Sequence, residues 1–148
     1  MEAKRKSELV MAALAPAKGA ALTPVQVQKL FFLIDRNASE SLGGPLFKFT
    51  PYHYGPFDAD VYREIERLSR DGLAEVTSNA QNFSMRTFRL TPKGQSEGEA
   101  MLAKLDERTR SYFEKVSDFV RKLSFADLVS AVYKAYPEMR ANSVFQEC

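Results

Sequence analysis

Histidine and cysteine, the side chains that most often hold metals or move protons near neutral pH, are rare in this sequence. The one histidine is His53, and the one cysteine is Cys148, the last residue of the sequence. A metal site needs several such ligands, and a nucleophile–base pair would have to form around this single imidazole ring. We therefore expect no metal site and no catalytic residue, and we expect Cys148 to be an inert, exposed thiol.

Carboxylates are plentiful, but their positions do not indicate an acid–base pair. They are scattered along predicted helices, as Glu64, Glu66, Glu97, Glu99, Asp106 and Glu107. The glycines do not form a phosphate-binding loop, because neither Gly43-Gly44 nor Gly55 is followed by the lysine or further glycines that such loops need. We expect no cofactor, neither ATP nor NAD, and a protein that is not an enzyme.

Three arginines could instead bind a partner through their charge. They share one side of a helix predicted over residues 58–71, opposite its apolar side: Arg63, Arg67 and Arg70. In one interpretation they contact DNA, together with Arg86 and Arg89 on the hairpin that follows. In the other they belong to a solvated helix face, because Asp60 can pair with Arg63 three residues on. Glu66 can likewise pair with Arg70, four residues on.

Composition indicates one globular domain over residues 1–148. Apolar residues make up 45% and charged residues 27% of a chain of ordinary domain length. The net charge is only +2, so we expect nucleic-acid binding to be weak, roughly 10⁻⁴ to 10⁻⁶ M, or absent. No apolar run approaches the roughly 20 residues of a membrane helix, and residues 1–6 lack a signal-peptide core, so we expect no membrane partner and a cytoplasmic location.

The first part of the chain predicts two helices and a long loop. One helix is expected over residues 4–15 and a second over residues 23–35, with Thr23 as its N-cap. The second is apolar on nearly every side, so we expect it to be the most buried element, with Phe31 and Ile34 inside. Its helical pattern then stops, and glycines, prolines and aromatics follow one another.

The expected loop insertion spans residues 37–57, and its composition is also compatible with a short strand in part of it. Near its end Tyr52, His53 and Tyr54 stand in a row. They could alternate in and out of the domain, with one or two rings beneath the third helix. Alternatively, they could face a partner, since tyrosine and arginine are enriched at interface hot spots.

The rest of the chain predicts a hairpin and three more helices. We expect strands over residues 73–77 and 85–90, joined by a polar loop over residues 78–84. Helices should follow over residues 92–105, 106–123 and 124–136. The residues expected to face inward on the last two are Tyr112, Val116, Phe119 and Leu123, then Phe125, Leu128, Val129, Val132 and Tyr136.

A helix that ends at glycine over residues 65–73, a hairpin, and a Leu-Thr-x-x-Gly turn within residues 88–94 resemble winged-helix regulators of the PadR and MarR kinds. The resemblance implies a winged-helix-like core over residues 22–94, made of three helices and a β-hairpin wing. In a DNA-binding member the third helix enters the major groove and the wing touches phosphate. The helices of such proteins are joined by about 3 to 4 residues, whereas residues 37–57 intervene here, which favours another partner.

A second resemblance covers residues 22–72. A Gln-Lys-Leu helix within residues 27–33, a Gly-x-Pro-Leu-Phe element within residues 43–47 and a Tyr-Gly-Pro turn before a helix at residues 52–62 are similar to the SocA and Panacea antitoxin family. The resemblance implies a non-catalytic protein that binds a partner, of a type used to neutralise a toxin encoded beside it. The face expected to bind comprises Tyr52, His53, Tyr54, Arg63, Arg67 and Arg70.

Together these patterns predict an α+β, mostly α fold: a winged-helix-like core over residues 22–94, with C-terminal helices over residues 95–148. The expected function is that of a non-catalytic protein-binding module whose partner is a protein, such as a neighbour-encoded toxin. A homodimer is also compatible with the sequence. The alternatives are a winged-helix DNA-binding transcriptional regulator, contacting DNA through Arg63, Arg67, Arg70, Arg86 and Arg89, and a structural accessory protein without a ligand.

Overall fold

Four helices begin at side-chain N-caps in the computed structural model, which describes residues 1–77 and 86–146. α2 (Pro24–Leu42) follows a capping box in which Thr23 and Gln26 exchange side-chain and backbone hydrogen bonds. Thr91, Asp106 and Ser124 accept hydrogen bonds at the starts of α4 (Pro92–Lys104), α5 (Glu107–Lys122) and α6 (Phe125–Ala135). The predicted α+β, mostly helical fold class is confirmed.

In the described part of the chain, four strands form two separate antiparallel hairpins. β1 (Thr50–Tyr52) pairs with β2 (Gly55–Phe57), and β3 (Ala74–Thr77) pairs with β4 (Thr87–Leu90). The second hairpin confirms the predicted pairing of residues 73–77 with the segment that ends at Leu90. The predicted polar loop over residues 78–84, the start of its second strand at residue 85, and the thiol of Cys148 lie outside the described residues.

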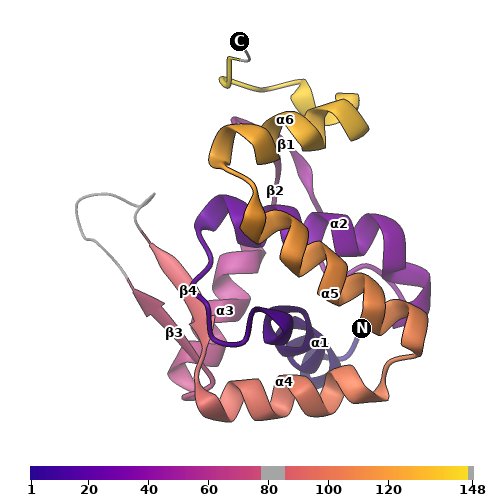
Figure 1. The fold of residues 1–148 in the computed structure, drawn as a ribbon, viewed down its shortest axis with the longest axis vertical. Helices are drawn as coiled ribbons and strands as arrows, with labels where there is room; N and C mark the ends of the chain where they lie inside the picture. The colour runs from indigo at the N-terminus through magenta and orange to yellow at the C-terminus, as the bar shows by residue number, and fades with distance from the viewer. Residues whose placement is uncertain (78–85, 147–148) are drawn as a thin grey trace.

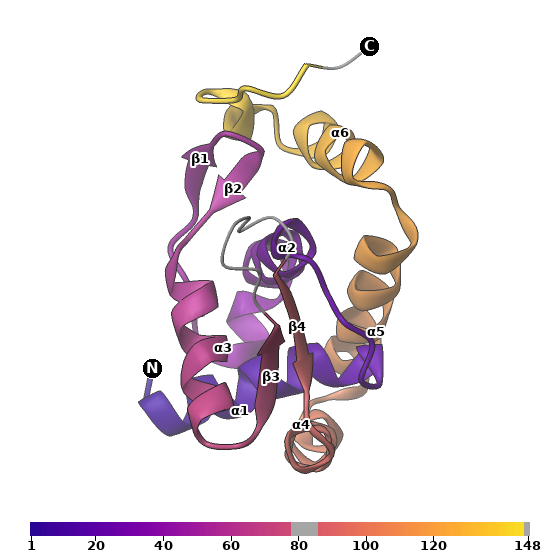
Figure 2. The ribbon, with the colours of Figure 1, turned by 90° about the vertical axis from the view of Figure 1, so that its left-hand side faces the viewer.

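α2 is the axis of the arrangement. Seen end-on in Figure 2, it lies between α3 (Asp60–Arg70) on one side and α5 on the other. α1 (Ala3–Leu14) packs along α4 at one end of the molecule, while the β1–β2 hairpin and α6 lie together at the other end (Figure 1). Short 3₁₀ helices follow α1 and α6, as η1 (Ala15–Ala17) and η3 (Pro137–Arg140). None of the helices described is long and apolar enough to span a bilayer.

The core is centred on α2, as predicted, but α1 shares it. Phe31 and Ile34 are fully buried. The last six residues of α1, Leu9–Leu14, are also all buried, because this half of the helix contacts α3, α4 and α5 rather than docking on the surface. As expected, α2 still contains more buried residues than any other helix described, nine against six in α1.

α2 is also longer than predicted, so the expected loop over residues 37–57 is wrong at its start. Residues 37–42 continue the helix because Ala38 and Leu42 extend the buried stripe of Ile34 at four-residue spacing. Gly43 then ends the helix with a φ of 90°, a left-handed conformation that glycine adopts without a steric penalty. The remaining segment contains the β1–β2 hairpin.

On the C-terminal helices the inward faces differ from the predicted ones. α5 fully buries Phe113 and Val120 beside the expected Val116, whereas Tyr112, Phe119 and Leu123 are only partly buried. On α6, Leu128, Val129 and Val132 face the core as predicted, but Phe125 is exposed. Its ring does not enter the core but faces Tyr54 of the β1–β2 hairpin.

Candidate functional site

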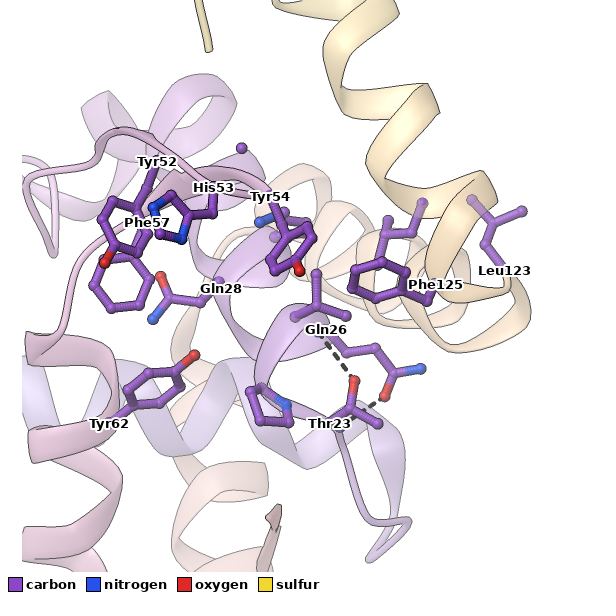
Figure 3. A pocket seen from close by; sticks show the side chains of 15 residues that line it. Thr23, Gln26, Gln28, Tyr52, His53, Tyr54, Phe57, Tyr62, Leu123 and Phe125 are labelled. Carbon is purple, nitrogen blue, oxygen red and sulfur yellow. Dashed lines mark hydrogen bonds between the residues drawn. The ribbon is translucent and has the colours of Figure 1, made fainter. Parts of the chain in front are cut away.

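A groove of about 460 Å³ opens between the start of α2, the β1–β2 hairpin and the junction of α5 with α6 (Figure 3). Tyr52, His53 and Tyr54 line it from the hairpin, while Leu123 and Phe125 line it from the junction. Its lining is mostly apolar and aromatic. None of the described residues that line it is an aspartate or a glutamate.

The hairpin tip presents its three aromatic side chains to solvent. Tyr52 and Tyr54 are 46% and 45% exposed, and His53 is exposed as well. The rings of Tyr52 and His53 stack at 4.2 Å between centroids. No ring of the three packs beneath α3, so the interpretation in which they alternate in and out of the domain is wrong. The rings instead contact one another and neighbouring rings: Tyr52 contacts His53 and Phe57, and Tyr54 contacts Phe125.

The C-terminal segment holds this tip in place. Val144 N–H donates a hydrogen bond of 2.9 Å to the carbonyl oxygen of His53, and the side-chain amide of Asn142 donates one of 3.2 Å to the carbonyl oxygen of Pro51. The hairpin is therefore tied to a part of the chain far away in sequence. Two-stranded hairpins are marginal on their own, so these bonds help to fix the position of the aromatic rings.

Phe125 faces the hairpin from α6. Its ring meets that of Tyr54 edge to face, with centroids 5.1 Å apart, and 46% of Phe125 remains exposed. Phe125 shares the helix face of Leu128, Val129 and Val132, but it is the first residue of α6 and lies one turn before the part of that face that is buried. The two rings approach each other across the groove in Figure 3. This contact joins two elements that the sequence places far apart.

Polar side chains of α2 fasten the inserted segment to the helix. Gln28 accepts a hydrogen bond from the N–H of Asp58 and donates one to its carbonyl oxygen, at 2.9 and 3.0 Å. Two turns further along α2, at the other end of the insertion, the carboxylate of Asp35 accepts bonds from the N–H groups of Leu46 and Phe47. In this segment, which lacks regular structure, side chains of α2 thus provide hydrogen-bond partners for backbone groups of Leu46, Phe47 and Asp58.

Lys29 is the one charged residue among those that line the groove, and it is almost completely buried. Its exposed fraction is 2%, and its ammonium group donates a hydrogen bond of 3.2 Å to the carbonyl oxygen of Pro56. Burial lowers the pKa of Lys29 from its usual 10.5 to about 7. Near neutral pH this amine therefore exchanges between its protonated and neutral forms far more readily than an ordinary lysine.

The three arginines of the predicted binding face do not line the groove. Arg63, Arg67 and Arg70 are exposed along α3, where the first pairs with Asp60 as predicted and the second with Glu64. Glu66 pairs with Arg86 at 3.1 Å and not with Arg70, because β4 brings Arg86 next to α3. Arg89 pairs with Glu75 across the β3–β4 hairpin. The structure thus separates the aromatic and the arginine parts of the predicted site.

We expect Arg67→Ala to lower the free energy of unfolding by about 1–3 kcal/mol. The side chain of Glu64 is only 8% exposed, and its Oε2 already has no hydrogen-bond partner among the described residues. Removing Arg67 would leave this carboxylate buried without a partner for Oε1 either. Urea unfolding at pH 7 measures the change. Arg63→Ala is the matched control, since both partners of its pair are more than half exposed and the cost should stay below about 1 kcal/mol. Equal costs would contradict the prediction.

Sequence reasoning missed Lys29 and Phe125 as site residues. A signal for Lys29 was present: it is a lysine within a helix that is otherwise apolar on nearly every side, where a charge has no solvated face to occupy. Phe125 carried no such signal, because its apolar character fits the core stripe of α6. Of the two interpretations of Tyr52, His53 and Tyr54, only the one in which they face a partner predicts that all three are exposed, as they are in the structure.

No model of a known protein family matches this chain, and none of the curated proteins compared with it matches it in sequence. The described part of the chain belongs to the α+β class and is mostly helical, with two small antiparallel hairpins.

Proposed function

We propose that this chain is a non-catalytic protein-binding module, similar to SocA and Panacea antitoxins, and that a protein partner docks in the groove. The observation that carries the proposal is the row of half-exposed aromatic side chains, Tyr52, Tyr54 and Phe125, around an apolar groove. Large aromatic side chains contribute most of the binding energy at many interfaces, because they bury much area at a small entropic cost.

The winged-helix arrangement belongs to the same proposal. α2, α3 and the β3–β4 hairpin follow one another in the order that the PadR and MarR resemblance implies. Leu22 also forms a bridge to Phe88 of β4, which connects the segment before α2 to the hairpin. In this reading the β1–β2 hairpin is an insertion between the second and third helices, and it supplies the aromatic side of the groove.

The charge distribution supports a protein partner over DNA. Of the five arginines that could contact phosphates, Arg63, Arg67, Arg86 and Arg89 each form an ion pair with a carboxylate of α3 or β3. A paired guanidinium adds little to the positive potential that attracts a duplex. Because most of these arginines are already paired, we propose the groove, and not the arginine face of α3, as the docking site.

The test is capture of the protein encoded by the neighbouring gene, co-expressed with this chain. Tyr54→Ala and Phe125→Ala should each weaken capture by about 1 kcal/mol or more, measured as a dissociation constant, because each removes one ring from the rim of the groove. Both residues are half exposed, so the far-ultraviolet circular dichroism spectrum and the melting temperature should remain close to those of the wild type.

The matched control is the double variant Arg63→Ala, Arg70→Ala, which removes exposed charge from α3 and leaves the groove intact. It should retain full capture. Loss of capture in this variant alone would move the binding face to the arginine side of α3. Full capture by both folded aromatic variants would contradict the proposal that the groove is the docking site.

A further inference from the structure

The ammonium group of Lys29 lies at the groove without a counter-charge. Within residues 1–77 and 86–146 no carboxylate forms an ion pair with it, and its one hydrogen bond goes to the Pro56 carbonyl oxygen. Buried lysines are rare unless they are paired, because desolvation disfavours the charged form. Here the desolvated lysine lies next to the groove.

The described groups around Lys29 are aromatic rings and hydrogen-bond donors, and none of the described residues that line the groove is an acid. The chain passes tightly over it at Gly55, where an added Cβ would lie 3.4 Å from Lys29 Cε and 3.4 Å from the ring of Tyr133 in α6. The buried hydroxyl of Tyr133 has no hydrogen-bond partner among the described residues. Towards the opening, His53 and Tyr54 line the groove from the hairpin, and Tyr62 lines it from α3. The guanidinium of Arg140 lies over the Tyr133 ring at 5.1 Å.

We propose that the groove recognises an acidic and apolar segment of the partner protein, in which a carboxylate side chain pairs with Lys29 while a neighbouring apolar side chain packs between Tyr54 and Leu123. This inference rests on the proposed function and specifies the chemistry of the partner. Charge complementarity favours an acidic segment. Lys29 places a buried amine at the groove, and none of the described lining residues is acidic, so an anion from the partner would be its counter-charge. Glutamate fits better than a chain terminus, because its two methylene groups let the carboxylate reach a buried amine while the backbone stays at the rim.

Binding of such a segment should depend on pH. Burial lowers the pKa of Lys29 to about 7, and a carboxylate favours the protonated amine, so binding would take up a proton above pH 7. The affinity should therefore fall as the pH rises from 6 to 9. None of the described residues that line the groove carries a carboxylate. The Lys29→Met variant removes the amine and keeps the tyrosines and His53, so any pH dependence that remains in it belongs to those side chains.

The experiment uses two matched probes that differ in one charge: N-acetyl-phenylalanyl-glutamic acid α-amide and N-acetyl-phenylalanyl-glutamine α-amide. Titration of the full chain, followed by nuclear magnetic resonance of its backbone amides, should give millimolar dissociation constants for such small ligands. At pH 6 the glutamate probe should bind about tenfold more tightly than the glutamine probe, the size expected for a hydrogen bond to a charged group. At pH 9 the preference should fall below about threefold.

In Lys29→Met the two probes should bind alike, while Tyr54→Ala should weaken both. Equal binding of the probes to the wild type at pH 6, a glutamate preference that survives Lys29→Met, or no shift of groove resonances at about 10 mM would overturn the inference. A third probe, the glutamine peptide with a free α-carboxylate, should bind no more tightly than the glutamine α-amide. Tighter binding of this probe would show that the groove recognises a chain terminus and would overturn the inference. The pH series on the wild type decides the matter even if Lys29→Met fails to fold. Capture that depends on Tyr54 and Phe125 without a glutamate preference would leave the proposed function standing.

Discussion

Gly94→Ala should lower the free energy of unfolding by about 3 kcal/mol or more, which is at the upper end for overpacking. A Cβ at this position would lie 1.9 Å from the carbonyl oxygen of Leu73 and 3.2 Å from a methyl group of Leu90. The first obstacle is backbone, so no rotamer change can relieve it, and α4 would have to move away from the β3–β4 hairpin. Urea unfolding followed by circular dichroism measures the change.

Ser96→Ala is the matched control for Gly94→Ala, because it adds no contact and lies on the exposed face of the same helix. Its free energy of unfolding should stay within about 0.5 kcal/mol of the wild type. A second site tests the same principle, since a Cβ at Gly98 would lie 2.5 Å from the carbonyl oxygen of Met11 in α1. Wild-type stability in Gly94→Ala would mean that α4 packs less closely on the hairpin than the structure indicates.

The stability of the wild type should rise with pH between 7.5 and 9.5, and Lys29 should be the cause. Its pKa is lowered to about 7 in the folded state, whereas the unfolded chain titrates near the usual 10.5. Between these values the unfolded state binds more protons, so the free energy of unfolding increases by up to about 1.4 kcal/mol per pH unit. Over two units the increase should amount to about 2 kcal/mol.

Lys29→Met isolates this contribution, because it removes the titrating amine and keeps an unbranched apolar side chain. The difference in unfolding free energy between wild type and variant, measured by urea unfolding at several pH values, should grow in favour of the wild type from pH 7.5 to 9.5. The measurement should stop below pH 10, since burial raises the pKa of Tyr62 to about 12 and its linkage has the opposite sign above pH 10. Parallel pH profiles of the two proteins would show that Lys29 titrates normally.

The helix starts and the second hairpin could be predicted from the sequence, and their success has a local cause. Thr23, Thr91, Asp106 and Ser124 cap helices through hydrogen bonds to groups three residues away, so a short window of sequence contains both partners. The end of α2 was harder to place. Asn37, Ser39 and Ser41 are poor helix formers, and the helix continues through them because Ala38 and Leu42 find a buried surface on the rest of the fold.

The candidate site was predicted in part. Tyr52, His53 and Tyr54 were candidates from their residue types, and they line the groove. Arg63, Arg67 and Arg70 lie elsewhere, because the direction of α3 relative to the hairpin is not encoded in the spacing of either element. The pairing of Glu66 with Arg86 in place of Arg70 has the same origin, since a tertiary neighbour competes with a partner on the same helix.

The sequence by itself determined the fold class, the capped helix starts, the pairing of β3 with β4 and the burial of Phe31 and Ile34, because these depend on hydrogen bonds and periodicities within a few turns of chain. Only the tertiary structure decided that Tyr54, Lys29 and Phe125 share one groove. These residues belong to three elements far apart in the chain, and their meeting depends on how α2, the β1–β2 hairpin and α6 pack. The lowered pKa of Lys29 follows from that packing as well, since a charge loses its hydration only when other elements cover it.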